Sequence, residues 1–112
     1  MVEISFRTTK LRKVFNSESL LRHEYGESNS RLIMRRMTVL RAASSLSEVS
    51  HQRPERRHEL TGSRAAEFAV DLTHPYRLVF RPAINPIPRR SDGGIDLAQV
   101  TAIEILSVED YH

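Results

Sequence analysis

Five histidines are the side chains best suited to proton transfer at neutral pH, because the unperturbed pKa of histidine is about 6.5. They are His23, His51, His58, His74 and His112. The sequence has no cysteine, which excludes disulfides, thiolate metal sites, iron–sulfur clusters and cysteine nucleophiles. Any chemistry must therefore come from histidine, arginine, tyrosine, hydroxyl or carboxylate groups.

The spacing of these histidines does not favour a metal site. His51 and His58 are separated by six residues, and no carboxylate motif frames them. The sequence also lacks a glycine-rich phosphate loop, a nucleophile elbow and a dinucleotide fingerprint. We therefore expect neither a metal nor an organic cofactor.

Arginine dominates the basic residues, because only Lys10 and Lys13 among the 17 lysines and arginines are lysine. Residues 1–64 carry 13 basic and 7 acidic side chains, whereas residues 65–112 carry 4 and 7. The planar guanidinium suits bidentate contacts with phosphate or carboxylate. This distribution indicates either an anionic partner for the first half of the chain or solvated helix faces.

Hydrophobic periodicity predicts one strand and two helices in the first half. The strand covers residues 2–6, and the first helix is capped by Thr8 or Thr9 and ends near residue 16. A break over residues 26–30 precedes the second helix. Its apolar stripe is Ile33, Met37, Leu40 and Ala43, and its outer faces carry Arg31, Arg35, Arg36 and Arg41.

The second half changes to the period of two that is typical of strands. Residues 67–72 and 76–80 predict a hairpin around Pro75, and residues 100–108 predict a further, central strand. The proline-rich segment 82–94 between them predicts a surface loop. With 112 residues, we expect one domain over 1–112, an α+β two-layer sandwich in the order β-α-α-β-β-β, with two helices packed on a mainly antiparallel sheet.

Three places in this arrangement could carry chemistry. Arg77 alternates with Leu78, so it points to the open face of the sheet if Leu78 faces the helices. His58 lies in a polar segment just before the second strand. Tyr111 and His112 directly follow the last predicted strand.

The chain resembles the HigB branch of the RelE/ParE toxin superfamily, and in particular proteins described as plasmid-maintenance killer proteins. The resemblance is carried by residues 57–64, 70–83 and 100–112, together with the loop residues 85–88 and 92–94. These segments occur in the order found in that branch, so the similarity covers essentially the whole chain.

The resemblance implies the RelE/ParE fold and the toxin of a type II toxin–antitoxin system, an endoribonuclease that cleaves mRNA on the ribosome without a metal. Its implied partners are a HigA-like antitoxin, the ribosome and mRNA, with operator DNA bound only through the antitoxin. No apolar run approaches the roughly 20 residues of a membrane span, and the first residues do not resemble a signal peptide. We therefore expect a cytoplasmic protein with no membrane partner.

The resemblance also implies a set of site residues. The catalytic pattern of the branch falls on His58, Arg77, Tyr111 and His112, and its substrate-binding positions fall on Thr61 and Arg64. Relatives commonly carry lysine where this sequence has Thr61. The two histidines would share the general acid and base roles in an order left open, Arg77 would stabilise the phosphorane, and Tyr111 would stack on or orient a base.

Two alternatives use the same fold. A ParE-like chain would inhibit a DNA topoisomerase by binding, without chemistry of its own. A degenerate toxin would bind its antitoxin only. Tyr111 and His112 favour the nuclease, whereas the absence of lysine at position 61 favours the alternatives.

Overall fold

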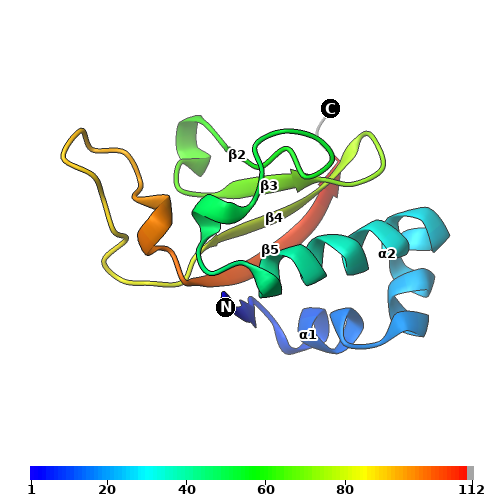
Figure 1. The fold of residues 1–112 in the computed structure, drawn as a ribbon. Coiled ribbons are helices and arrows are strands. Elements are labelled where there is room, and N and C mark those ends of the chain that lie inside the picture. Colours follow the sequence, from blue (N-terminus) through cyan, green and yellow to red (C-terminus); the bar gives the residue numbers. More distant parts are fainter. Residues whose placement is uncertain (111–112) are drawn as a thin grey trace.

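Two helices cover one face of a five-stranded sheet in the computed structural model, which describes residues 1–110 (Figure 1). The sheet order is β1-β5-β4-β3-β2. The strands are β1 (Glu3–Phe6), β2 (His58–Glu59), β3 (Phe68–Asp71), β4 (Tyr76–Pro82) and β5 (Ala102–Asp110). The predicted α+β two-layer class is confirmed, and β2 is a short strand that the prediction left in a loop.

The helices are α1 (Thr9–Phe15) and α2 (Glu18–Ala42), and each begins at a side-chain cap. The Thr8 hydroxyl accepts from Leu11 N–H, and the Ser17 hydroxyl accepts from Leu20 N–H. The second helix begins earlier than predicted. The expected break is a kink at Gly26, whose φ of 83° is a backbone conformation that L side chains rarely adopt.

The main core lies between the helices and one face of the sheet. The predicted stripe of α2 is buried, and so are the side chains of Leu78, Phe80 and Ile105 on the facing side of the sheet. Phe68 and Phe80 stack across β3 and β4 with ring centroids 6.0 Å apart. Strand alternation thus sends one set of side chains into this core and leaves the other set on the opposite face.

β5 is an inner strand of the sheet, and it joins β1 to the strands of the second half of the chain. It pairs in parallel with β1 and antiparallel with β4. The pairing of β1 with β5 is the one parallel contact in the sheet formed by residues 1–110. The prediction of a mainly antiparallel sheet is therefore confirmed.

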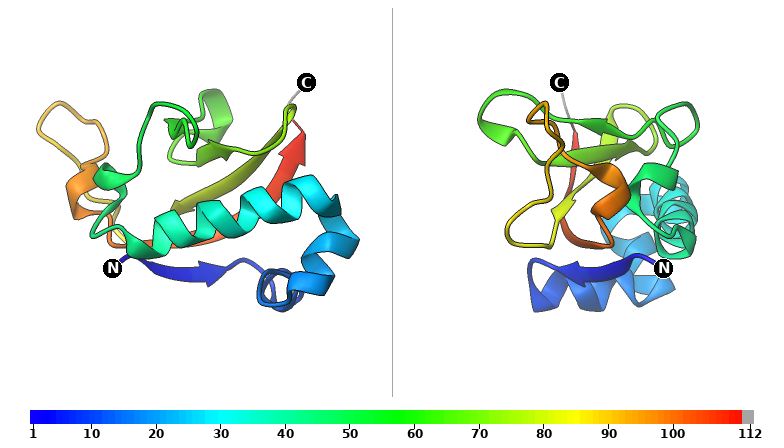
Figure 2. Two further views of the ribbon diagram at one scale, coloured as in Figure 1. Left: turned by 45° about the vertical axis from the view of Figure 1, so that its right-hand side comes forward. Right: turned by 60° about the vertical axis from the view of Figure 1, so that its left-hand side comes forward.

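The segment between β4 and β5 forms the expected excursion, which extends away from the helices (Figures 1 and 2). It contains a small bridge between Arg89 and Ile95. Within residues 1–110, no helix combines the length and apolar character needed to cross a membrane.

The prediction that Arg36 lies on an outer face of the second helix is wrong. Arg36 is buried, and its Nε–H donates to the backbone oxygen of Asp71 at 2.7 Å. β2 covers only the first part of β3, so Asp71 lies at an edge that lacks a strand partner. Arg36 therefore donates to a backbone oxygen that a neighbouring strand would otherwise satisfy.

Candidate active site

The face of the sheet away from the helices carries the predicted site residues. Strand register places Asp71, Arg77 and Glu109 in one row across β3, β4 and β5. The neighbouring row holds His58, Ala69, Val79 and Ser107. Because Leu78 is fully buried in the core, Arg77 points to this open face, as predicted.

A cluster of ion pairs occupies the middle of this face. Arg64, in a one-turn helix at Gly62–Arg64, donates from Nη1 and Nη2 to the two carboxylate oxygens of Glu109 at 2.7 and 2.8 Å. Its Nε and Nη2 also donate to Glu67 at 2.9 and 2.8 Å. One guanidinium therefore joins the β2–β3 connection to β5, across the intervening strands.

Glu109 is the electrostatic centre of the cluster. Hydrogen bonds from Arg64 and Ser107, together with the charges of Arg64 and Arg77, hold the pKa of Glu109 at about 2. The same bonds to Glu109 and Glu67 raise the pKa of Arg64 above its ordinary value. Both groups are therefore charged at neutral pH.

We predict that Glu109→Gln lowers the free energy of unfolding at pH 7 by about 1–3 kcal/mol, because Arg64 loses its bidentate partner. The folded pKa of Glu109 is depressed below 4.5, so its contribution is fully present above the unfolded value. That contribution is lost as the pH falls through about 2.

Urea unfolding at several pH values checks this. The difference between the wild type and Glu109→Gln should shrink as the pH drops from neutral towards 2. Glu18→Gln is the control, since its ion pair with Arg22 is exposed and stabilises little. A difference between wild type and Glu109→Gln that does not change with pH would contradict the assignment.

Arg77 lies beside the same carboxylate at a longer distance. Its Nη2 is 3.8 Å from Glu109 Oε1, compared with 2.7 Å for Arg64, and its side chain is 15% exposed. Arg77 thus has a largely desolvated guanidinium at the centre of the open face. Such a group interacts strongly with an anion that reaches it.

His58 lies on the same face, two strands from Arg77. β2 and β4 are separated by about 10 Å, and Ala69 and Asp71 of β3 lie between them on this face. The Nδ1 of His58 is 2.9 Å from the backbone oxygen of Arg56. Because a carbonyl accepts only, Nδ1 carries the proton in this contact, and the lone pair of a neutral imidazole is then on Nε2.

The two predicted substrate-binding residues differ in their surroundings. Thr61 is exposed, and its side chain does not cap the short helix that follows it. Arg64 is held by the two carboxylates of the cluster. The structure therefore shows Arg64 as a structural cation, and the place of the expected lysine is taken by a neutral hydroxyl.

Tyr111 and His112 lie outside the described residues. The residue before them, Asp110, is paired with Tyr76, next to Arg77 on β4. Asp110, the last described residue, therefore lies beside the row of Asp71, Arg77 and Glu109.

A hollow of about 400 Å³ opens at the Asp71 end of that row. It is lined by Arg36, Arg53, Pro54, Arg56, Asp71, Leu72 and His74. Arg56 donates to both oxygens of Asp71 at 2.7 and 2.8 Å. Arg36 is buried, whereas Arg53 is exposed at this hollow and is placed to contact a phosphate beyond the central pair.

Several residues of this region did not emerge from the sequence. Glu109 lies inside the last strand, and its role depends on pairing with Arg77 and on a loop that brings Arg64 across. The one available signal was the period of two, which puts Ser107 and Glu109 on the same face. Within residues 1–110, no group of three or more histidine and carboxylate side chains is placed to hold a metal ion.

Comparisons with known proteins add no assignment at this point. A scan against protein-family models finds no match, and a search of curated proteins finds no significant similarity.

Proposed function

We propose that this chain is the toxin of a type II toxin–antitoxin system, similar to the HigB branch of the RelE/ParE superfamily, and that it cleaves mRNA on the ribosome in the cytoplasm. The observation that carries the proposal is the shared face of His58 and Arg77 on the side of the sheet away from the helices. Tyr111 and His112 enter the proposal through the resemblance. The resemblance assigns catalytic roles to these same four residues.

The chemistry needs a base for the 2′-hydroxyl, an acid for the departing 5′-oxygen and a cation beside the phosphate. The contact of His58 Nδ1 with Arg56 favours His58 as the base, because it directs the lone pair to Nε2. His112 would then supply the proton to the 5′-oxygen. The 2′-oxygen attacks phosphorus, the P–O5′ bond breaks, and a cyclic phosphate and a 5′-hydroxyl result.

Arg77 would stabilise the negative charge that develops on the phosphate. Its pair with Glu109 is longer than that of Arg64, so an RNA phosphate would compete with Glu109 for Arg77 more readily than for Arg64. Before the phosphate binds, Glu109 would keep Arg77 in place from β5, and Arg64 holds Glu109. The exposed Arg53 at the neighbouring hollow would contact another phosphate of the message.

Purified ribosomes carrying a defined mRNA test the proposal. We predict cleavage of the message in the presence of ribosomes, and much slower cleavage of the same RNA alone, since the resemblance implies that the ribosome aligns the substrate. In cells, induction should stop incorporation of labelled amino acids before that of labelled thymidine. Arrest of DNA synthesis first, with intact mRNA, would contradict the nuclease.

Thr61→Lys should accelerate cleavage by up to about tenfold, because a charged donor makes a stronger phosphate contact than a neutral hydroxyl. Arg64 does not replace that charge, because two carboxylates hold it. The gain should decrease with added salt, since position 61 is exposed.

Single-turnover cleavage rates measure this effect, and Thr61→Gln is the control of similar length without charge. A Lys variant no faster than the Gln variant would show that the cation has no function in this chain.

Inhibition of a DNA topoisomerase, in the manner of ParE, is the second candidate. The ion-pair cluster favours it, because Glu67 and Glu109 neutralise Arg64 and position 61 carries no charge. A toxin without nuclease activity that only binds its antitoxin would be consistent with the same observation. The labelling experiment separates both from the nuclease.

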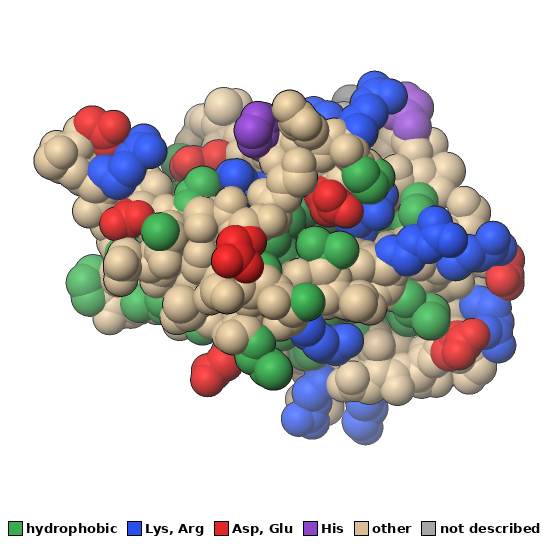
Figure 3. Space-filling view, viewed as in Figure 1, with side chains coloured by type: hydrophobic (Ala, Val, Ile, Leu, Met, Phe, Trp, Pro, Cys, Tyr) green, Lys and Arg blue, Asp and Glu red, His purple; other side chains and the backbone are tan. Residues whose placement is uncertain are grey.

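A cognate HigA-like antitoxin is the proposed protein partner, with operator DNA bound through the antitoxin. Lysine and arginine side chains gather over α1 and α2 (Figure 3), which suits an acidic partner. The RNA and the antitoxin would therefore both use the positive charge of the first half of the chain.

A further inference from the structure

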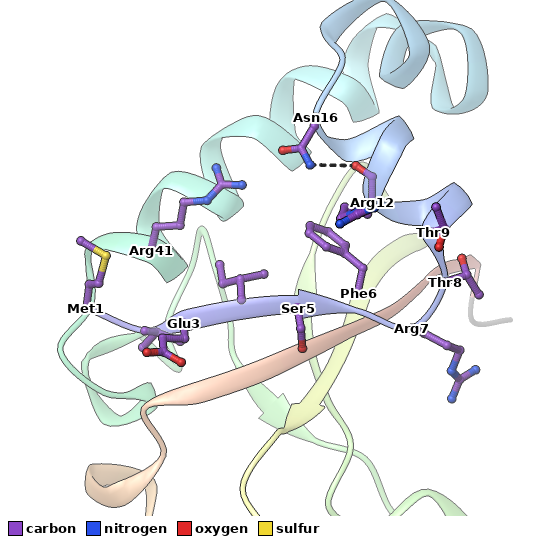
Figure 4. Close-up of a pocket in the computed structure, with 12 residues that line it drawn as sticks. Met1, Glu3, Ser5, Phe6, Arg7, Thr8, Thr9, Arg12, Asn16 and Arg41 are labelled. Atoms are coloured by element: carbon purple, nitrogen blue, oxygen red, sulfur yellow. Dashed lines mark hydrogen bonds between the residues drawn. The ribbon is translucent and has the colours of Figure 1, made fainter.

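The outer edge of β1 forms the floor of a large hollow. Its volume is about 770 Å³, and it is lined by β1 itself and by side chains from α1 and the end of α2 (Figure 4). β1 is the first strand in the sheet order, so only one of its edges is paired. This edge is separated from the candidate active site by β5.

The backbone of β1 offers hydrogen bonds to a further strand. Glu3 N–H and Arg7 N–H donate inward, to Thr101 and Ile105 at 2.9 Å each. Successive residues of a strand direct their backbone groups to opposite edges, so the N–H and C=O groups of Ile4 and Phe6 point into the hollow. An unpaired row of this kind is a template for strand addition.

The side chains around this edge are mainly cationic. Arg7, Arg12 and Arg41 are exposed, and none forms an ion pair with another residue of 1–110. In Figure 4, Arg12 and Arg41 lie on the helix side of β1, whereas Arg7 lies at its end. Glu3 is the one acidic residue that lines the hollow.

These observations favour an acidic peptide over the other possible occupants. A second copy of this chain would bring the same arginines against one another. A nucleic acid would meet the charge, but its phosphates cannot donate to the carbonyls of Ile4 and Phe6. An extended peptide with acidic side chains satisfies both the backbone and the arginines.

We propose that the edge of β1 binds an extended, acidic segment of a partner protein, which adds to the sheet as a sixth strand. Alternate side chains of that segment contact Arg12 and Arg41, and the backbone pairs with Ile4 and Phe6. The proposal concerns protein binding at this edge and does not depend on the nuclease.

A fluorescein-labelled peptide of alternating Glu and Val tests it by fluorescence polarisation. Two variant peptides serve for comparison. In the first, the backbone nitrogens of the Val residues are methylated, which removes hydrogen-bond donors to β1 without changing the charge. In the second, Lys replaces Glu, which reverses the charge. We expect both changes to lower the affinity by at least about tenfold. In nuclear magnetic resonance spectra, the amide signals of Ile4 and Phe6 should shift on addition of the unmodified peptide.

Two double variants of equal net charge complete the test. Arg12→Glu with Arg41→Glu should lower the affinity by at least about tenfold, whereas Arg31→Glu with Arg35→Glu, on α2 outside the hollow, should leave it nearly unchanged. The proposal would be overturned if the methylated peptide bound as tightly as the unmodified one, or if both double variants lost the same affinity. Displacement of the peptide by a uridine oligonucleotide, or dimerisation of the protein through β1, would also overturn it.

Discussion

Replacing His58 by Ala lowers ribosome-dependent mRNA cleavage by roughly 10²–10⁴, which is the usual contribution of a general acid or base. The physical reason is the loss of the imidazole Nε2, which the contact between Nδ1 and Arg56 leaves as the basic nitrogen. Single-turnover cleavage on programmed ribosomes measures the effect, because it separates chemistry from product release.

A matched variant distinguishes catalysis from folding. His58→Asn retains an N–H near the position of Nδ1, so it can still donate to Arg56, but it has no basic nitrogen. It should be as inactive as His58→Ala and unfold at the same urea concentration as the wild type. His51→Ala, in an exposed loop, is the control for loss of a histidine elsewhere. Cleavage by His58→Asn at the wild-type rate would remove His58 from the mechanism.

Ending the chain at Asp110 is the second change with a large expected effect. Removal of Tyr111 and His112 should lower cleavage by roughly 10²–10⁴ and abolish growth arrest, because the proposed acid is lost. The cluster of Arg64 with Glu67 and Glu109 lies within the retained residues. The shortened chain should therefore keep its fold and its binding to the antitoxin.

Growth on induction, circular dichroism and co-purification with the antitoxin measure the three properties separately. His112→Gln, which keeps the length of the chain and removes only the imidazole, should be as harmless as the truncated chain. Undiminished growth arrest by the truncated chain would contradict the nuclease and favour topoisomerase inhibition. Loss of antitoxin binding would instead show that these two residues belong to that interface.

The elements with a clear period were predictable from the sequence, and the contacts between distant elements were not. Residues 2–6 alternate over the length of β1, and the hairpin around Pro75 appears as β3 and β4. The start of α2 was missed because residues 18–30 are mostly polar and contain Gly26, which the helix tolerates as a kink. β2 has only two residues and no periodicity of its own.

For the site residues, too, local periodicity was predictable from the sequence and contacts between distant elements were not. The direction of Arg77 could be predicted from alternation alone, since Leu78 next to it had to enter the core. The engagement of Arg64 could not, because it depends on Glu109, 45 residues further along the chain. The burial of Arg36 was also unpredictable, because it follows from the incomplete cover of β3.

The pairing of β5 with both β1 and β4 has a consequence for synthesis of the protein. Glu3 pairs with Ala102, so β1 can pair with β5 only after almost the whole chain has been synthesised. The row of Asp71, Arg77 and Glu109 is likewise incomplete until β5 has joined β4. Contacts this distant in sequence form late in folding. The nascent chain therefore carries no assembled candidate site until β5 has been made.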